Sequence, residues 1–174
     1  MTRAEEWKGP LAAFIDHYRY QADLTADLDT LGSAPFTQDV INEIVLWKVN
    51  RYAKLSPSGL EALNSVTAIQ PKAHRTAAAV LAALLRESGV DIAMASTFLR
   101  FRNKKAFQII DRHAYRAIYG KDYPLHASSS DADKIELYFL YLDELYALAD
   151  SKQINFQILD RVLYVFDKQI NGKL

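Results

Sequence analysis

Apolar side chains recur at helical spacing along most of the chain, whereas runs that alternate apolar and polar positions are scarce. The first segment of this kind extends from Trp7 to about Leu24. Its apolar positions are Leu11, Phe14, Ile15, Tyr18 and Ala22. Steps of three and four residues place such side chains on one face of an α-helix, whereas a half-buried strand needs steps of two. The pattern therefore predicts an all-α fold.

Capping and breaking residues divide the rest of the chain into further helices. Ser, Thr, Asp and Asn are preferred before the first turn of a helix, and Gly and Pro are preferred beyond its ends. The helices predicted on this basis run from Thr37 to Asn50, Ser56 to Ser65, Ala73 to Arg86, Asp91 to Phe101, Asp111 to Tyr119, Asp131 to Ala149 and Asn155 to Ile170. A tight turn is expected at Ser88-Gly89-Val90, and residues 103–110 are expected to be irregular.

Aromatic residues and leucines follow helical spacing in the last two predicted helices, and we expect them to form core stripes. These positions are Tyr138, Phe139, Tyr141, Leu142, Leu145 and Tyr146, followed by Phe156, Leu159, Leu163, Tyr164 and Phe166. The chain has 174 residues, half of them hydrophobic, so it is long enough to bury such a core without disulfides or a structural metal.

Composition excludes several classes of chemistry. The chain has no cysteine, which rules out disulfides, thiolate zinc sites and thiol nucleophiles. Its four histidines show no ligand spacing, so no metal site is predicted. The charged N-terminus lacks the apolar core of a secretory signal, and no apolar run approaches the length of a membrane span. These features predict a cytoplasmic protein without a membrane segment.

The net charge is zero, but the charges are separated along the chain. Residues 45–125 contain 13 Lys and Arg against 5 Asp and Glu, a net charge of +8, whereas residues 1–44 and 126–174 carry −5 and −3. One interpretation is a basic face that binds a polyanion. The other is that the acidic ends pack beside the basic middle and neutralise it. The sequence leaves both open.

The segment from Thr76 to Gly120 combines a hairpin, a basic loop and an acidic helix start. Gly89-Val90 joins two predicted helices, and small residues follow at Ala95-Ser96. Ile110-Asp111-Arg112-His113 opens the next helix about 20 residues after the hairpin. In this combination the segment resembles the helix–hairpin–helix DNA glycosylase superfamily, in which a Gly-Val-Gly hairpin is followed at similar spacing by an apolar pair and an aspartate. A weaker resemblance covers Glu43 to Asn50, which is similar to an early helix of that family that ends in an amide side chain.

The resemblance implies a two-lobed, all-helical bundle in which residues 1–174 form a single unit. The N- and C-terminal helices would form one lobe, and residues from about 37 to 125 would carry the helix–hairpin–helix lobe. It also implies double-stranded DNA as the partner and no cofactor. The residues expected to contact DNA are Gly89, Val90, Asp91, Arg100, Arg102, Lys104, Lys105 and Arg112, with Asn50 filling the space left by an extruded base.

Asp111 is the residue that the resemblance assigns to catalysis. Cleavage of an N-glycosidic bond passes through an oxocarbenium-like cation, which a fixed carboxylate stabilises while it orients a water. Asp111 is also a favourable N-cap by itself, so a purely structural role is the alternative. Three other sites also have a structural alternative: His113 as a packed side chain, Asn50 as a helix end, and the cations from Arg100 to Lys105 as a solvated loop.

Three departures from the family pattern limit the chemistry. Asp91 stands where the hairpin has its second glycine, and its carboxylate would occupy the N–H groups that bind a phosphate. No lysine occurs in residues 91–95, so the Schiff-base lyase route of the bifunctional members is not expected. The cysteines of the iron–sulfur module are absent. The hypothesis is therefore a monofunctional DNA N-glycosylase that hydrolyses the bond, and the alternative is a catalytically inactive binding or scaffold protein of the same fold.

Overall fold

The computed structural model describes residue 10 and residues 21–31, 35–49, 53–126 and 128–172. Every regular element in these ranges is helical, as the periodicity predicts. The chain divides into two units, residues 1–52 and residues 53–174. The two-lobed arrangement stays a prediction.

The first unit contains two described helices, α1 (Ala22–Asp29) and α2 (Gln38–Lys48). Thr37 caps α2 as predicted, since its side chain accepts a hydrogen bond from the Val40 N–H. The Trp47 indole donates to the Thr25 hydroxyl at 2.9 Å and so links α2 to α1. The predicted helix from Trp7 to Leu24 differs from the structure at its end, because Gln21 adopts a left-handed conformation (φ 44°) and α1 begins at Ala22 and runs to Asp29. The first part of the predicted helix lies outside the described residues, as does Asn50.

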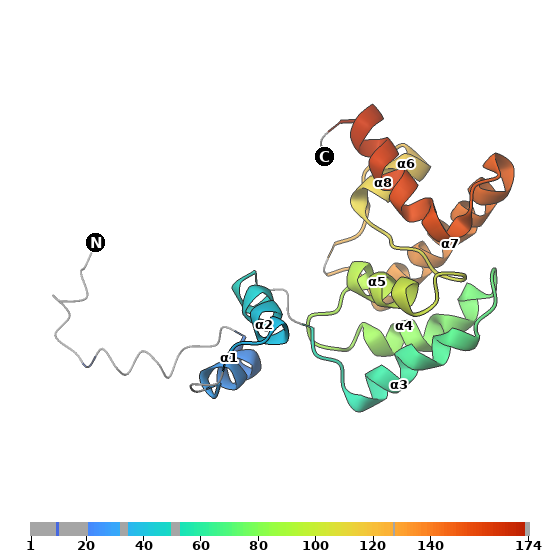
Figure 1. Ribbon diagram of the computed structural model, residues 1–174. Coiled ribbons are helices and arrows are strands. Elements are labelled where there is room, and N and C mark those ends of the chain that lie inside the picture. Colours follow the sequence, from blue (N-terminus) through green and yellow to red (C-terminus); the bar gives the residue numbers. More distant parts are fainter. Residues whose placement is uncertain (1–9, 11–20, 32–34, 50–52, 127, 173–174) are drawn as a thin grey trace. The chain divides into compact units, whose positions relative to one another are not determined.

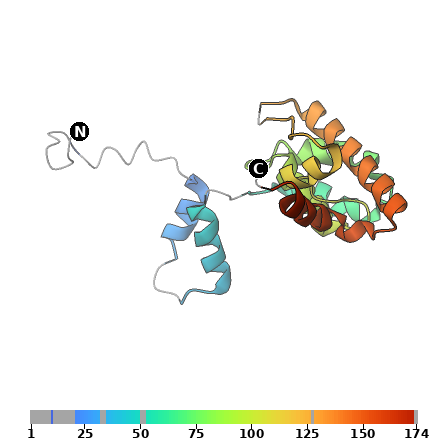
Figure 2. The same ribbon diagram turned by 90° about the horizontal axis from the view of Figure 1, so that it is seen from above.

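The second unit contains the remaining helices, which pack around a common core (Figures 1 and 2). Their bounds are α3 (Pro57–Ser65), α4 (Ala78–Leu84), α5 (Ile92–Arg102), α6 (Arg112–Tyr119), α7 (Asp131–Lys152) and α8 (Leu159–Ile170), with short 3-10 turns at Val66–Ala68, His74–Ala77 and Phe156–Ile158. In Figure 1, α3 and α4 lie at one end of this unit and α6 and α8 at the other, with α5 between them. None of the described helices is both long and apolar enough to cross a membrane.

Most helix boundaries of this unit follow from local chemistry. Ser56 caps α3 with Pro57 in its first turn, and Asp111 caps α6 by accepting the Ala114 N–H at 2.7 Å. Gly120 ends α6 with φ 63°, a left-handed conformation that favours glycine. The predicted helix from Ala73 to Arg86 is less regular, because its first turn is a 3-10 helix and α4 ends at Leu84.

The hairpin between α4 and α5 forms where the sequence predicts it. Gly89 adopts φ 76°, and the buried Val90 side chain joins the core. Glu87, within the same turn, accepts hydrogen bonds from the backbone N–H and the hydroxyl of Ser56. These bonds lower the pKa of Glu87 and fix the hairpin to the start of α3.

The irregular segment 103–110 crosses the interior and carries the chain to Asp111. Several of its carbonyl groups accept hydrogen bonds from the hydroxyls of α7 tyrosines: Tyr138 donates to Gln108 at 2.8 Å, Tyr141 to Ile109 at 3.0 Å, and Tyr146 to Lys105 at 3.1 Å. Buried backbone polar groups need such partners, and the tyrosines supply them without a helix or sheet. The segment is therefore fixed although it is irregular.

The core stripes are only partly as predicted. The six α7 positions are buried, and so are Leu159 and Leu163 of α8. Tyr164 and Phe166, which were also expected in the core, are 38% and 47% exposed. These two side chains lie on opposite sides of the buried stripe of α8, so the helical spacing predicted a wider core face than the structure has.

Candidate functional site

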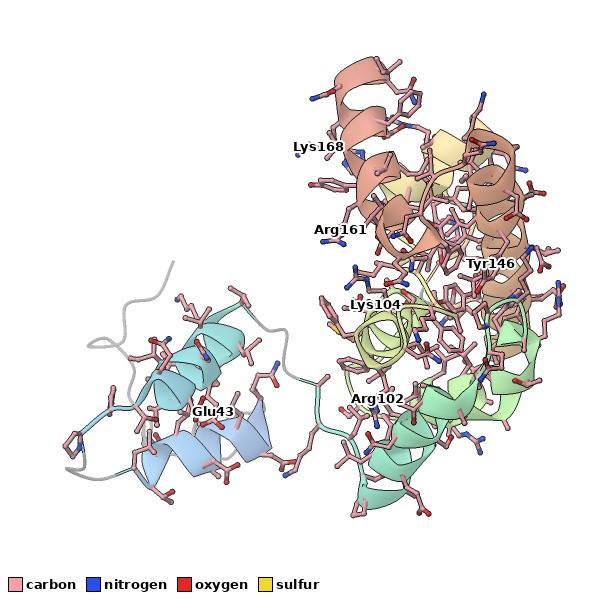
Figure 3. The ribbon with its side chains drawn as sticks, turned by 45° about the vertical axis from the view of Figure 1, so that its right-hand side comes forward. Glu43, Arg102, Lys104, Tyr146, Arg161 and Lys168 are labelled. Carbon is pink, nitrogen blue, oxygen red and sulfur yellow. The ribbon has the colours of Figure 1, made fainter. Side chains whose placement is uncertain are left out.

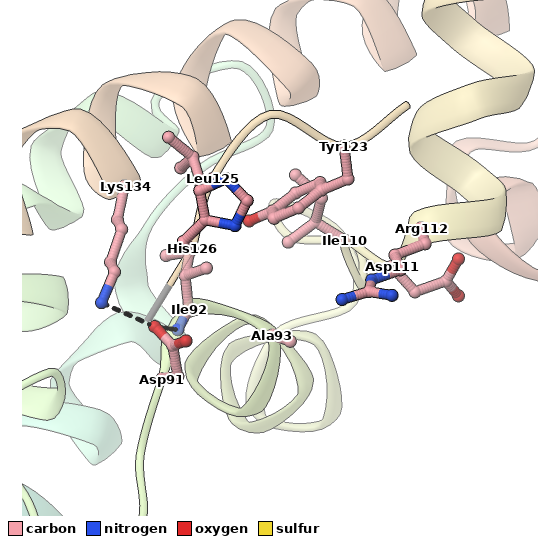
Figure 4. A pocket seen from close by; sticks show the side chains of 10 residues that line it. All are labelled: Asp91, Ile92, Ala93, Ile110, Asp111, Arg112, Tyr123, Leu125, His126 and Lys134. Carbon is pink, nitrogen blue, oxygen red and sulfur yellow. Dashed lines mark hydrogen bonds and ion pairs between the residues drawn. The ribbon is translucent and has the colours of Figure 1, made fainter. Parts of the chain in front are cut away.

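A cavity of about 360 Å³ lies beside the start of α5 and the start of α6 (Figure 4). Five parts of the second unit line it: the first residues of α5, the end of the irregular segment, the start of α6, the loop after Gly120, and the first turn of α7. The lining residues are Asp91, Ile92, Ala93, Ile110, Asp111, Arg112, Tyr123, Leu125, His126 and Lys134. The hairpin helix and Asp111 therefore meet at one cavity, although they are about 20 residues apart in sequence.

Asp111 is held firmly at the edge of this cavity. Its Oδ1 accepts the Ala114 N–H, which fixes the side chain at the N-terminus of α6. The preceding residue is fixed too, because the buried Ile110 N–H donates to the Ser96 hydroxyl at 3.2 Å. The next residue, Arg112, is exposed. In Figure 4 its guanidinium extends toward the middle of the cavity, whereas the Asp111 carboxylate points the other way, toward α6. Asp111, whose side chain is fixed, and the Arg112 cation therefore both line the cavity.

Asp91 closes the N-terminus of α5. Its Oδ1 accepts the Ile92 N–H at 2.8 Å and lies 3.0 Å from Nζ of Lys134, whose side chain is 9% exposed. The first backbone donor of α5 is thus occupied by a carboxylate. A phosphate that approaches here meets this negative charge rather than an open row of N–H groups.

Tyr123 contributes a buried hydroxyl to the cavity wall. No hydrogen-bond partner is found for its Oη within the described part of the chain. Burial raises the pKa of Tyr123 to about 12, so the phenol stays protonated and can donate a hydrogen bond. Figure 4 shows this hydroxyl on the same side of the cavity as His126. A buried donor without a protein partner is what a polar ligand would satisfy.

The structure divides the predicted DNA-contacting residues between the two ends of α5. Asp91, Arg112 and Asp111 lie at the cavity, next to the exposed Gly89 and the buried Val90. Arg102, Lys104 and Lys105 are exposed at the other end of the helix.

Arg100 is separate from both groups. Its side chain is 9% exposed, its Nε lies 3.5 Å from Oδ2 of the buried Asp160, and its Nη2 donates to the Gln157 carbonyl at 3.3 Å. Arg100 is therefore held in the interior by Asp160 and Gln157 rather than exposed with its neighbours.

Tyr123, His126 and Lys134 belong to the site, although the sequence did not indicate them. The loop that carries Tyr123 and His126 has no motif, and Lys134 reads as an ordinary residue in the first turn of a helix. Their role arises from a loop and a helix that fold back against α5. Among the described residues, no group of three or more histidine and acidic side chains is placed so that it could hold a metal ion.

His113 also has a defined position. Its Nδ1 lies 2.7 Å from Oδ2 of Asp167, a carboxylate with no exposed surface, and its ring packs edge-on against Tyr164. Asp167 also binds Arg116, so the two residues on α6 are both attached to α8. The packed interpretation of His113 agrees with these contacts.

Comparison with known proteins adds no family to this picture. No family model, curated protein or solved structure matches the chain.

Proposed function

We propose that the chain binds duplex DNA and hydrolyses the N-glycosidic bond of an extruded base, with Asp111 as the essential carboxylate. One observation carries the proposal: Asp111 and the first turn of the hairpin helix line the same cavity. Its volume of about 360 Å³ lies in the range of small-molecule sites. An enzyme that acts on a base within a duplex needs such a pocket, because the base must leave the stack.

Asp111 supplies what the reaction requires. As the bond between C1′ and the base nitrogen breaks, its electron pair leaves with the base, and positive charge develops on the sugar. A carboxylate fixed beside the sugar stabilises that charge, and a water held by it adds to C1′ and gives up a proton to the carboxylate. The Ala114 N–H keeps one oxygen of Asp111 in place, so little reorganisation is needed.

The other cavity groups have roles that fit a base and its backbone. The protonated Tyr123 hydroxyl can donate to a carbonyl or ring nitrogen of the base. The Arg112 guanidinium, exposed at the mouth, can pair with a phosphate. Since Asp91 occupies the start of α5, the phosphate affinity comes from side-chain cations rather than from hairpin N–H groups.

The test is Asp111→Asn, with duplexes that carry alkylated, deaminated or oxidised bases. Asparagine caps helices as well as aspartate does, so the substitution removes the charge and keeps α6 intact. We expect the variant to bind duplex like the unchanged protein and to release no base. Asp91→Asn, a matched change of a carboxylate on the same cavity, should retain release. The proposal fails if Asp111→Asn still releases base, or if the unchanged protein releases none of these bases.

A second candidate is a binding or scaffold protein of the same fold without catalytic activity. The observation that favours it is the closed N-terminus of α5, where Asp91 takes the Ile92 N–H and pairs with Lys134. Under this hypothesis duplex affinity stays at background level at both low and high salt. Under the first it falls steeply as salt rises, because phosphate contacts release counterions.

A further inference from the structure

A second groove lies at the C-terminal end of α5, the end opposite to the Asp111 cavity. It has a volume of about 490 Å³ and is lined by Thr67 and by residues 100–105. Arg102, Lys104 and Lys105 are exposed there, and none of the lining residues is acidic. The Nε of Arg102 donates to the Asn64 side-chain oxygen at 2.9 Å, a neutral acceptor that leaves the positive charge in place. The groove is therefore electropositive.

Phe101 places an aromatic ring among these cations. It is 73% exposed, the highest value among the large hydrophobic side chains described, so it contributes little to the core. The Arg100 guanidinium lies 5.0 Å from the centre of the ring, and Arg100 is itself held by Asp160 and the Gln157 carbonyl. An immobilised cation next to the ring steadies it. The result is a flat apolar surface with cations around it.

The positive charge continues onto α8. The Nε of Arg161 lies 3.9 Å from Oδ1 of Asp160, the same carboxylate that pairs with Arg100, so the start of α8 adjoins the groove. Lys168 follows seven residues later and lies on the same face of that helix. Figure 3 shows Arg102, Lys104, Arg161 and Lys168 along one side of the second unit.

We propose that this basic–aromatic groove, formed by Phe101, Arg102, Lys104 and Lys105, binds a single-stranded nucleic acid segment. The cations contact successive phosphates, and the Phe101 ring stacks on an unpaired base. This combination of cations and exposed rings is how proteins hold single strands. A duplex keeps the faces of its bases stacked inside and would leave the ring unused.

The inference rests on the proposed function only in taking nucleic acid as the partner. It adds that the face at the C-terminal end of α5 recognises an unpaired strand, independently of the cavity at Asp111. The two sites are separable because they lie at opposite ends of one helix. A variant can therefore remove either one without touching the other.

The experiment measures fluorescence anisotropy of a labelled oligothymidylate of about twenty nucleotides with the full chain. Phe101→Ala should weaken binding about tenfold, the loss expected when one stacked base is removed. Phe36→Ala is the matched control, since that ring is 58% exposed in the first unit, and it should leave affinity unchanged. The double variant Lys104→Glu and Lys105→Glu should abolish binding, whereas Lys152→Glu, an exposed cation elsewhere, should have little effect. Unchanged circular dichroism verifies that each variant is folded.

The outcomes separate this inference from the proposed function. Binding to oligothymidylate that depends on Phe101 supports the inference whether or not base release is detected. Asp111→Asn should leave this binding unchanged. The inference is overturned if the unchanged protein does not bind the strand, if Phe101→Ala and Phe36→Ala lose affinity equally, or if polyglutamate competes as well as oligothymidylate does. None of these results bears on the hypothesis that base is released at the Asp111 cavity.

Discussion

Replacing Asp167 by asparagine tests how firmly α6, and with it Asp111, is attached to the rest of the second unit. The carboxylate has no exposed surface and accepts hydrogen bonds from Arg116 Nε at 3.0 Å, Arg116 Nη2 at 2.8 Å and Asn171 Nδ2 at 2.7 Å. His113 Nδ1 lies 2.7 Å away. Asp167→Asn keeps the shape of the side chain but removes its charge, and it places an amide N–H₂ against donors.

The expected loss of unfolding free energy follows from the burial of the ion pair between Asp167 and Arg116. Removing one partner from a buried ion pair costs about 3–5 kcal/mol, because the other charge is left without compensation. The Arg116 side chain is 17% exposed, so water replaces part of the lost interaction and the lower end applies, about 3 kcal/mol. For a domain of this size, such a loss lowers Tm by roughly 10 °C.

The pH dependence gives the test a second readout. The Arg116 guanidinium, with the bonds from Asn171 and His113, holds the pKa of Asp167 well below its usual range. Its contribution to stability is therefore complete above the unfolded carboxyl pKa of about 4, and it is lost as the pH falls toward the folded pKa. The gap in unfolding free energy between the unchanged protein and Asp167→Asn should be largest near pH 7 and should narrow below about pH 4.

Urea denaturation followed by circular dichroism at pH 7 and at pH 3 measures the loss of unfolding free energy and its dependence on pH. Asp150→Asn is the control, because Asp150 pairs with Lys72 at 2.8 Å but both side chains are more than half exposed. An exposed pair of this kind contributes at most about 1 kcal/mol. The reasoning is refuted if the unfolding free energy of Asp167→Asn at pH 7 is less than about 1 kcal/mol below that of the unchanged protein, or if this difference is the same at pH 3 as at pH 7.

Two further predictions concern the cavity. Tyr123→Phe removes a buried hydroxyl for which no partner is described, so the free energy of unfolding should stay the same or rise, while base release should slow. If urea denaturation instead shows a loss of stability of about 1 kcal/mol, the hydroxyl is hydrogen-bonded within the folded protein. Asp91→Gly removes the carboxylate from the start of α5, so duplex affinity at low salt should rise, and a fall would show that Asp91 does not exclude phosphate.

Local chemistry was sufficient to predict much of the fold. A cap such as Thr37, Ser56 or Asp111 acts within one turn of its own helix, so the sequence contains both partners of the hydrogen bond. The left-handed Gly120 and the turn at Gly89 are local in the same way. These features locate the start of α6, and hence Asp111, before any long-range contact is considered.

The lining of the cavity depends on contacts between distant parts of the chain. Lys134 pairs with Asp91 only because the start of α7 lies against the start of α5. The tyrosines of α7 were predicted as apolar core, but their hydroxyls also satisfy the irregular segment, which helical spacing cannot reveal. Arg100 was grouped with its exposed neighbours, although the buried Asp160 draws it into the interior. In each case the partner, and therefore the role, lies in another element.

The two ends of α5 differ in charge in a way that its dipole explains. The N-terminus carries a partial positive charge, which Asp91 neutralises, while the C-terminus carries a partial negative charge that is complemented by Arg100 and Arg102. A polyanion therefore meets a carboxylate at the hairpin and a group of cations at the far end. If the two ends of α5 contribute to nucleic acid affinity, most of that contribution comes from Arg102, and from Lys104 and Lys105 just beyond the helix, rather than from the hairpin. Asp91→Gly should then change duplex binding at the cavity but leave oligothymidylate binding at Phe101 as it was.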